Sequence, residues 1–544
     1  MNQLWAVDSL PYPNWDLYTV YQSLVTINES EEANYGQIQF LPALASNWTV
    51  SANGLLWTFN LRQGINFSNG DPFNAYQAWL EEYGLYYLSG NSSNWFVSFP
   101  IFNMSVVNFG PQTISAINSS GGITNPSQQT LNMMMNSSWP IYVTGEYTLV
   151  FHLSSPVTWL LGALVAYLGL MFDTQYVLDN GGFGTPTTIN TNFDTVPIPG
   201  TGPYTITGVQ VNGYVTYQQN PTYWGKDLSA AQIAANPVLS PGNVKNVIVY
   251  FKSDDLTRYA DLSTGAAQVA AITEQDWPLV EANPNLYGYT TSPAVGQLPP
   301  VIALNTMLYP TNITDFRLAI VHAINYSDIL QTVFYGQMNT LIGPGIPAYP
   351  QYYDLGNFSQ YSYNVTLAMQ YLNMSGVTSI PTLNFNTVAT CDFCIEAAQI
   401  IQSDLSQIGI TVNIGLTTLA QWYTVYGSSY SAMSTPSNLQ MMGQMTFDEG
   451  LWVGPDTATP VDQWVATVSN RSTFGNDALY SNPTVEEAVT ALLSSNNVSY
   501  IQPLVQNAQS VIYNSAPYVW LGNCKLTLCD GSIVYNSKLI KPGF

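Results

Sequence analysis

Charged residues are scarce in this chain. Asp, Glu, Lys and Arg together make up 8% of its 544 residues, against about 25% in an ordinary soluble protein. Cations are the scarcer kind: 33 carboxylates stand against 10 Lys and Arg, which gives a formal net charge of −23 at pH 7. Without clustered Lys and Arg, nucleic acid is excluded as a partner. We interpret the composition as that of a protein exposed to an acidic exterior, where carboxylates approach their reference pKa of about 4.

Catalytic and metal-binding motifs are also missing. The chain has only 2 His, and no Ser or Cys stands beside either in the manner of a nucleophilic triad. No metal-ligand spacing occurs. The pairs Glu81-Glu82 and Asp448-Glu449 suggest a glycosidase, but neighbouring residues point in different directions, so each pair supplies at most one catalytic group. We therefore expect a protein with no enzyme activity, no metal and no cofactor.

The glycine-rich stretch PGTGPYTITG at 199–208 is not a phosphate loop. That motif requires a Lys directly after its last Gly, and the first Lys after Gly202 is Lys226. In the dinucleotide-binding pattern the third glycine position falls on Thr205. The residues that follow alternate like a strand, so the stretch predicts a turn that leads into a strand.

Cysteine occurs only as two close pairs, Cys391 with Cys394 and Cys524 with Cys529. A zinc site needs both pairs in one place, and a thioredoxin-like motif needs a βαβ setting. We expect two local disulfides, which suit an oxidising exterior. Free thiols and metal or redox chemistry are the alternatives.

N-x-[ST] sequons also favour an exported protein with surface glycans. They lie at Asn28, Asn47, Asn66, Asn91, Asn103, Asn118, Asn136, Asn312, Asn325, Asn357, Asn364, Asn373, Asn470 and Asn497.

The one candidate for a membrane span is the apolar run 157–172, which has about 16 residues where a span needs about 20. Pro156 precedes it and Asp173 follows it, so we expect a buried helix. The first residues, MNQLWAVDSLPYP, lack the basic start and apolar run of a signal peptide. We therefore expect a mature or trimmed form of an exported protein.

Strand-like and helix-like patterns alternate along the chain, which favours α/β lobes. We expect a helix to begin at Asp71-Pro72, surface loops at 91–140, a βαβ-like unit at 243–272 and a single strong helix at 314–336. The Pro299-Pro300 pair is a candidate crossover between domains. Aromatic residues are abundant, with 14 Trp, 37 Tyr and 21 Phe; most must be core, but Tyr and Trp also suit a cleft for sugars or peptides.

An ordered set of motifs identifies a resemblance. The matching pieces are VYQSLVTIN (20–28), FLPALASNWTVSANGLLWTFNLRQGINFSNGDPFNAYQAW (40–79), PGTGPYTITG, NPTYWG (220–225), NTMLYPTNITDFRLAIVHAIN (305–325), LSQIGITVNI (405–414) and YSNPTVEEAV (480–489). In this order they resemble the family 5 extracytoplasmic solute-binding proteins of ABC transporters, the dipeptide and oligopeptide class, which also includes archaeal oligosaccharide binders. Where the family commonly has FHDG, this chain has FSNG at 67–70.

The resemblance implies an α/β fold of the two-lobed periplasmic-binding-protein type, the type II, oligopeptide-binding class, with a hinge and an extra domain. The first lobe is expected at 1–40, 160–298 and 506–544, the extra domain at 41–159 and the second lobe at 299–505. The implied mechanism is hinge closure on a ligand, which a permease then recognises. The protein would be extracellular and cell-surface associated, anchored by a segment or signal that this chain does not contain. A secreted glycoside hydrolase or peptidase and a structural surface glycoprotein are the alternatives.

The resemblance also points to a ligand site. Peptide binders of this class use an Asp after a Trp to pair with the peptide's ammonium group, and Asp456 after Trp452 is the nearest match. Helix capping by Asp456 and core packing of Trp452 are the alternative roles. We expect Gly454, Tyr21, Asn305 and Trp422 to line the same cleft. No Lys or Arg occurs between 318 and 470, so either a peptide held by its amino end or a long neutral sugar fits.

Overall fold

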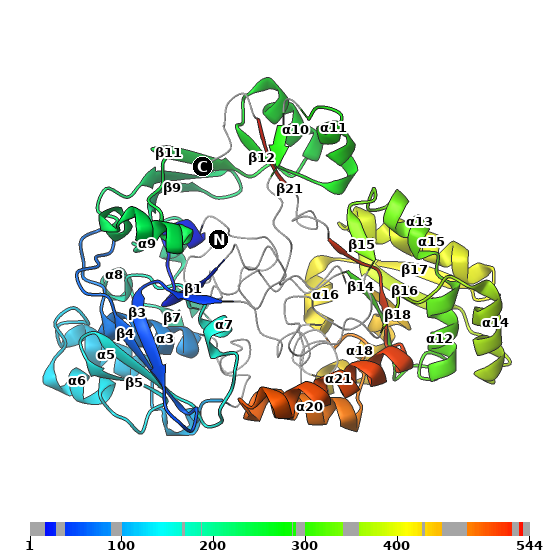
Figure 1. The fold of residues 1–544 in the computed structure, drawn as a ribbon, viewed down its shortest axis with the longest axis horizontal. Helices are drawn as coiled ribbons and strands as arrows, with labels where there is room; N and C mark the ends of the chain where they lie inside the picture. The colour runs from blue at the N-terminus through cyan, green and yellow to red at the C-terminus, as the bar shows by residue number, and fades with distance from the viewer. Residues whose placement is uncertain are drawn as a thin grey trace.

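The computed structural model describes residues 17–28, 39–88, 101–165, 169–185, 188–284, 287–289, 300–340, 358–426, 430–448, 476–524 and 532–536. Figure 1 shows helices and strands of the N-terminal half of the chain at the left and, joined by the C-terminal strand β21 (Ser532–Asn536), at the top, and those of the C-terminal half at the right. We call them the first and second lobes.

The first lobe contains small antiparallel sheets. Strands β11, β10 and β9 form one sheet, and β12, β21 and β13 form another, so the chain returns to this lobe near its C-terminus. The strands are β1 (Val25–Ile27), β2 (Phe40–Pro42), β7 (Gly184–Thr185), β8 (Thr188–Ile189), β9 (Tyr204–Gln210), β10 (Tyr214–Gln219), β11 (Asn246–Tyr250), β12 (Val269–Ile272), β13 (Tyr287–Tyr289) and β21 (Ser532–Asn536). The helices are α1 (Leu17–Val20), α7 (Leu160–Val165), α8 (Thr174–Asp179), α9 (Ala230–Ala235), α10 (Asp255–Thr264) and α11 (Trp277–Glu281).

Strand β11, helix α10 and strand β12 confirm the element order expected at 243–272. The βαβ-like unit itself is wrong, because β11 and β12 lie in different sheets. β11 pairs with β10, its neighbour along the chain, whereas β12 pairs with β21 from the far C-terminus. A local pattern carries no information about such a distant partner.

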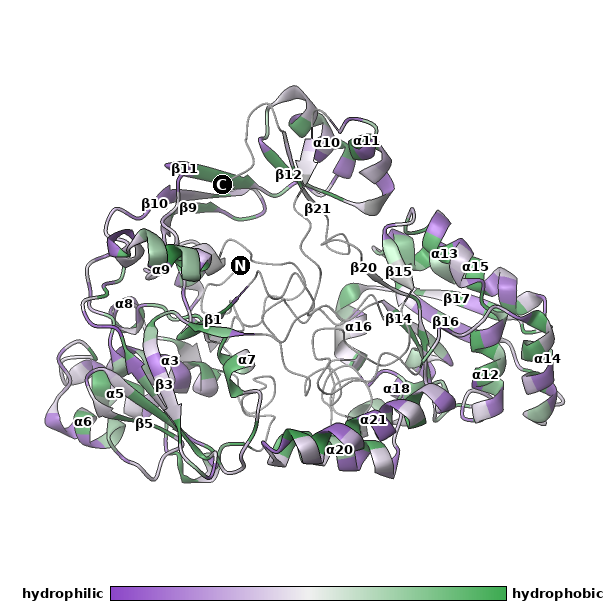
Figure 2. Cartoon of the chain, in the orientation of Figure 1, coloured by the Kyte–Doolittle hydropathy of each residue, from purple (hydrophilic) through white to green (hydrophobic). Residues whose placement is uncertain are grey.

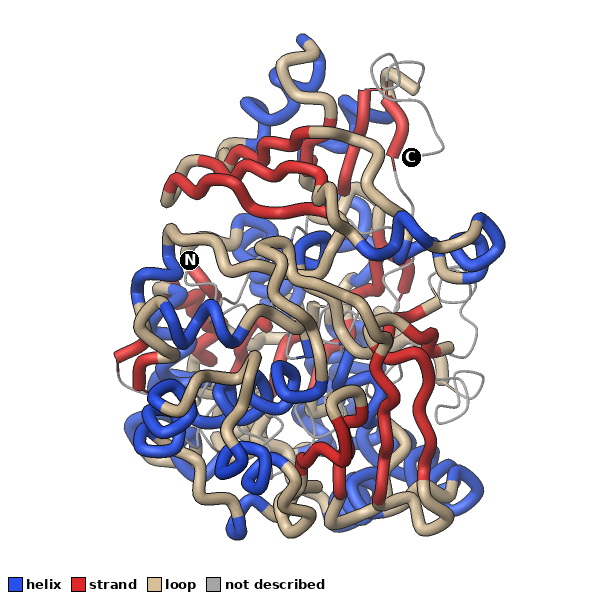
Figure 3. Tube along the Cα trace, turned by 90° about the vertical axis from the view of Figure 1, so that its left-hand side faces the viewer, coloured by secondary structure: helices blue, strands red, loops and turns tan. Residues whose placement is uncertain are grey.

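The extra domain is a four-stranded antiparallel sheet in the order β3-β4-β6-β5, with α3 packed against it. Viewed from the first-lobe side, the β9–β11 sheet lies above this sheet (Figure 3). The elements are β3 (Ala45–Val50), β4 (Leu56–Leu61), α3 (Ala75–Leu88), α5 (Pro111–Ser119), α6 (Gln128–Met134), β5 (Ile141–Gly145) and β6 (Thr148–His152).

Two expectations for the extra domain are wrong. Helix α3 begins at Ala75 rather than at Asp71-Pro72, because the Asn74 side chain accepts the N–H groups of Tyr76 and Gln77 and so provides the N-terminal cap. Residues 91–140, expected as loops, contain α5 and α6. Pro111 in the first turn of α5 and a Ser127 cap on α6 are the local signals for these helices.

The second lobe is built on a five-stranded sheet in the order β17-β16-β18-β14-β19. β16 is parallel to both β17 and β18, whereas β14 is antiparallel to β18 and β19. The strands are β14 (Val301–Leu304), β15 (Met338–Thr340), β16 (Leu383–Val388), β17 (Val412–Thr417), β18 (Met445–Asp448), β19 (Tyr518–Trp520) and β20 (Gly522–Cys524). The helices are α12 (Thr314–Ala323), α13 (Tyr326–Thr332), α14 (Val365–Met374), α15 (Asp392–Ser406), α16 (Leu419–Tyr426), α17 (Tyr430–Met433), α18 (Pro436–Met442), α20 (Pro483–Ser494) and α21 (Val498–Ser515).

The single helix expected at 314–336 is wrong, because the chain forms α12 and α13 with a break at Ile324 and Asn325. The Asn325 side chain accepts the backbone N–H of Asp328 and starts the second helix. The pairing of β19 with β14 joins residues 518–520 to the second-lobe sheet, whereas the sequence assigned 506–544 to the first lobe.

The apolar run 157–172 contributes α7, whose six residues are all buried. Over the described ranges, no helix has the length and apolar character needed to cross a membrane. Figure 2 shows the mixture of hydrophobic and hydrophilic residues along α20, whose buried members are Val485, Ala488, Val489, Ala491, Leu492 and Leu493.

Candidate ligand-binding site

The carboxyl ends of β16, β17 and β18 lie at one edge of the second-lobe sheet. Val388 is paired with Thr417 where β16 and β17 end, and β18 ends at Asp448. Ligands of α/β proteins bind beyond the carboxyl ends of parallel strands. This edge is therefore the candidate site within the second lobe.

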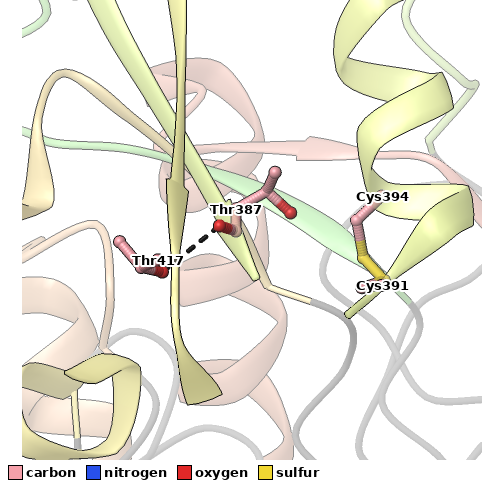
Figure 4. The surroundings of a disulfide bond; sticks show 4 residues. All are labelled: Thr387, Cys391, Cys394 and Thr417. Atoms are coloured by element: carbon pink, nitrogen blue, oxygen red, sulfur yellow. Dashed lines mark hydrogen bonds between the residues drawn. A yellow bond between two sulfur atoms is a disulfide. The ribbon is translucent and has the colours of Figure 1, made fainter. Parts of the chain in front are cut away.

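A disulfide lies at this edge (Figure 4). Cys391 and Cys394 are bonded at the start of α15, directly after β16, and are 6% and 1% exposed. The Thr417 hydroxyl donates to the Thr387 carbonyl at 3.2 Å. The Thr387 side chain is itself buried, and its hydroxyl has no hydrogen-bond partner in the described part of the chain. The Cys391–Cys394 disulfide thus links the end of β16 to the helix that follows it. In the second expected disulfide, the partner of Cys524 is Cys529, which lies outside the described residues.

Trp422 lies near the same edge, on α16, which follows β17. Trp422 is 9% exposed, and its ring stacks on that of Tyr426, with ring centroids 4.8 Å apart. The Tyr426 hydroxyl is in turn 2.6 Å from the Thr446 hydroxyl in β18. The aromatic pair is therefore fixed to the sheet, and most of the Trp422 surface is covered.

Asn305 lies at the opposite edge, directly after the last residue of β14. Its backbone N–H donates to the carbonyl of Gln444, the residue before β18. Its side-chain oxygen accepts the N–H of Met307, and its side-chain nitrogen is buried with no hydrogen-bond partner among the described residues. The structure thus places Asn305 and Trp422 at different edges of one sheet.

Tyr21 is in the core of the first lobe, beneath the glycine-rich stretch. It is 2% exposed, and its hydroxyl donates to a backbone carbonyl at 3.0 Å. A Cβ on Gly200 would lie 2.1 Å from the carbonyl oxygen of Val20, and the Gly202 N–H donates to the same oxygen at 2.8 Å. The glycines therefore allow two backbone segments to approach closely. The predicted turn and strand are confirmed, because β9 begins at Tyr204.

A polar network beside Tyr21 escaped the sequence analysis. The Gln22 amide donates to the Tyr223 hydroxyl at 3.1 Å and accepts the Trp224 indole N–H at 2.8 Å. The Arg62 guanidinium lies 5.2 Å from the centroid of the Trp224 ring. Burial raises the pKa of Tyr223 to about 12. The signal that could have found the network is the pairing of the VYQSL and NPTYWG motifs, which are about 200 residues apart.

Positive charge in the second lobe is used structurally. Arg317 is the one Lys or Arg in the lobe's described residues. Its guanidinium donates to the carbonyls of Ser515 and Thr311 at 2.9 and 2.8 Å and to the Thr314 hydroxyl at 3.2 Å. Burial lowers its pKa to about 10. The described edge of the sheet therefore offers a ligand no cation.

Some of the expected positions lie outside the described residues. These include Trp452, Gly454 and Asp456; the last described residue before them is Asp448, where β18 ends. Among the sequons, Asn91, Asn357 and Asn470 lie outside; Asn28 and Asn325 are half-buried, and the remaining described asparagines are exposed.

Comparison with known proteins gives consistent matches. The family model for bacterial extracellular solute-binding proteins, family 5 (middle), matches residues 39–448. Di/tripeptide-binding protein 2 of Pseudomonas aeruginosa (strain UCBPP-PA14) is 25% identical over 494 residues, covering 90% of this chain and 82% of that protein.

Two solved structures share the fold. NikA from Brucella suis, in complex with Fe(III)-EDTA, superposes with a TM-score of 0.71 at 19% identity, covering 98% of this chain and 93% of that one. DppA from Helicobacter pylori, in complex with the peptide STSA, superposes with a TM-score of 0.66 at 20% identity, covering 96% and 88%.

Proposed function

This chain belongs to family 5 of the bacterial extracellular solute-binding proteins, and we propose that it captures a short peptide between its lobes for an ABC transporter. Proteins of this family bind solutes outside the cytoplasmic membrane and deliver them to transporter permeases, and its relatives are not enzymes. The observation that carries the peptide proposal is the similarity to a di/tripeptide-binding protein over 90% of the chain. We further propose that the protein stays associated with the cell surface.

The charge of the second lobe supports recognition of a peptide's amino end. No Lys or Arg occurs between 318 and 470, and the nearest described cation, Arg317, already donates to backbone carbonyls. A ligand ammonium group would meet no competing cation there. In the proposal, Asp456 pairs with that ammonium group and Trp452 stacks on the ligand; such charge-assisted bonds are about twice as strong as neutral ones.

The same scarcity of cations favours a second candidate, a neutral oligosaccharide. The one described cation of this lobe, Arg317, already donates to backbone carbonyls and so is not available to a peptide's carboxylate, whereas a sugar needs no cation. Sugars stack on aromatic rings and bond to neutral polar groups, and the chain has 37 Tyr and 14 Trp. We keep this ligand class as the alternative.

Calorimetry with Asp456→Asn separates the candidates. Wild type and variant are titrated with a peptide series and with cello- and malto-oligosaccharides, and Asp328→Asn, which removes an exposed carboxylate in the same lobe, is the control. Loss of a charge-assisted bond should weaken peptide binding by about 10- to 100-fold, with the control unchanged. Peptide affinity that survives Asp456→Asn would refute the ammonium role, and binding of sugars alone would replace peptide by oligosaccharide.

A further inference from the structure

The two lobes are joined by a hydrogen bond between residues that are far apart in the sequence. Trp159, at the end of the extra domain, is 2% exposed, and its indole N–H donates to the backbone carbonyl of Leu492 at 3.1 Å. Leu492 is a buried residue of α20 in the second lobe. The bond is therefore shielded from water and lies between the lobes rather than within one.

A second close approach lies beside it. Gly54, in the turn between β3 and β4, faces the segment between α20 and α21. A Cβ on Gly54 would lie 2.5 Å from the side-chain nitrogen of Asn496 and 2.9 Å from the Cβ of Pro156. The extra domain thus contacts the second lobe at more than one point, through a turn and a buried tryptophan.

The contact lies far from the strands through which the chain passes between the lobes. In Figure 1, α20 runs along the bottom of the molecule and reaches the extra domain, whereas β21, which returns the chain to the first lobe, lies near the top. A rotation that opens the lobes at the top connections would separate their lower ends. We infer that Trp159 and Leu492 form a latch that holds the lobes closed.

The latch gives the extra domain a role in binding. This role rests on the proposed function, in which the lobes close on a ligand about a hinge. The latch itself is formed by protein atoms alone, so it favours the closed state before any ligand is bound. A hydrogen bond of ordinary net strength shifts such an equilibrium about fivefold. Removing it should therefore increase the open population of the ligand-free protein and weaken the binding of any ligand that requires closure.

Small-angle X-ray scattering of ligand-free protein tests the latch, with Trp159→Phe compared against Trp79→Phe. Trp79 is a matched control, because it is fully buried and its indole N–H donates to the Ile141 carbonyl, also at 3.1 Å, but within the extra domain. We expect Trp159→Phe to increase the radius of gyration and Trp79→Phe to leave it unchanged. Equal radii for both variants and wild type, or equal increases in both variants, would overturn the latch.

A glycine pair supplies the second test. Gly54→Ala and Gly64→Ala impose similar backbone strain, because the two φ angles are 73° and 77°, but nothing lies within 4 Å of a Cβ on Gly64. Only Gly54→Ala should increase the radius of gyration of the ligand-free protein. Equal radii for the two variants would contradict the inference. The scattering comparison uses ligand-free protein, so its result does not depend on whether the protein binds peptides. The calorimetry of Asp456→Asn, in turn, does not depend on whether the latch exists.

Discussion

The buried carboxyl pair of α3 predicts that this protein loses stability as the pH rises. Glu81 is 0% exposed and Glu82 is 7% exposed. Both oxygens of Glu81 and one of Glu82 have no hydrogen-bond partner in the described part of the chain. Burial, and then the charge of Glu82, raises the pKa of Glu81 well above its ordinary range, and burial raises the pKa of Glu82 from 4.5 to about 8. The folded state therefore holds protons that the unfolded chain releases.

The sign and size of the effect follow from linkage. A carboxyl whose pKa is raised by folding contributes its full stability below the unfolded pKa of 4.5 and loses it as the pH rises toward 8. At about 1.36 kcal/mol for each pH unit between these two values, the upper limit for Glu82 is about 5 kcal/mol. Relaxation and entry of water reduce such penalties, so we expect a loss of about 2–4 kcal/mol between pH 4.5 and 8.

Glu82→Gln is the test, because the amide keeps the shape of the side chain but cannot ionise. The free energy of unfolding is measured by urea titration with tryptophan fluorescence at pH 3, 4.5, 6 and 8. Wild type should lose stability across this range, and the variant should lose less. Glu396→Gln, an exposed site on α15, should follow the wild-type curve. A wild type that is most stable at pH 8, or a Glu82→Gln curve parallel to that of wild type, would refute the reasoning.

Three further changes test how the fold is held together. Gly200→Ala should lower the melting temperature and reduce the free energy of unfolding by about 3 kcal/mol, because the added Cβ would collide with the Val20 carbonyl. An unchanged melting temperature would show that the close approach of these two backbone segments does not require glycine. Arg317→Met should lower the free energy of unfolding in a urea titration by about 3 kcal/mol, because it removes the donor to the buried Thr311 carbonyl and the half-buried Ser515 carbonyl, and an unchanged free energy would show that these bonds contribute little. Replacing Cys391 and Cys394 together by Ser should lower stability by about 2 kcal/mol, the value for a short disulfide-closed loop; calorimetric scans that coincide with wild type would show no such contribution.

Local patterns predicted most individual elements but not their partners. Strand β11, helix α10 and strand β12 confirm the strand, helix and strand expected at 243–272, since an amphipathic period and a β-branched run each act over a few residues. The break between α12 and α13 went unrecognised because Asn325 can either continue a helix or cap the next one, and its contact with Asp404 in α15 favours the cap. Pairing of β12 with β21 joins segments more than 250 residues apart, which no local pattern encodes.

The same limit applies to the candidate site. The glycine-rich stretch was interpreted correctly as a turn into a strand, because the alternation of the residues after it is a local pattern, whereas the close approach of Gly200 to Val20 is a tertiary contact that the sequence did not indicate. Trp422 could be proposed from the sequence, but its stacking on Tyr426 depends on helix phase and on the sheet beneath. Tyr21 is an aromatic residue whose burial the sequence alone could not distinguish from an exposed position in a cleft. Side-chain identity thus indicates which chemistry is available, and tertiary packing decides where it is placed.

A second buried carboxyl group, that of Asp173, lies at the border of the extra domain and is held by a neutral side chain. Asp173 is fully buried, and burial raises its pKa to about 7 although the Tyr176 N–H and the Asn69 amide both donate to it. Asn69 also donates to Asp71 at 2.8 Å. It occupies the position where the FHDG motif of related proteins has an Asp, and a third carboxylate there would remove the only side-chain donor to both acids among the described residues. A neutral amide can bond to these carboxyls whether or not they are protonated. Like those of Glu81 and Glu82, the buried Asp173 carboxyl is compatible with the folded state when protonated and destabilises it when ionised.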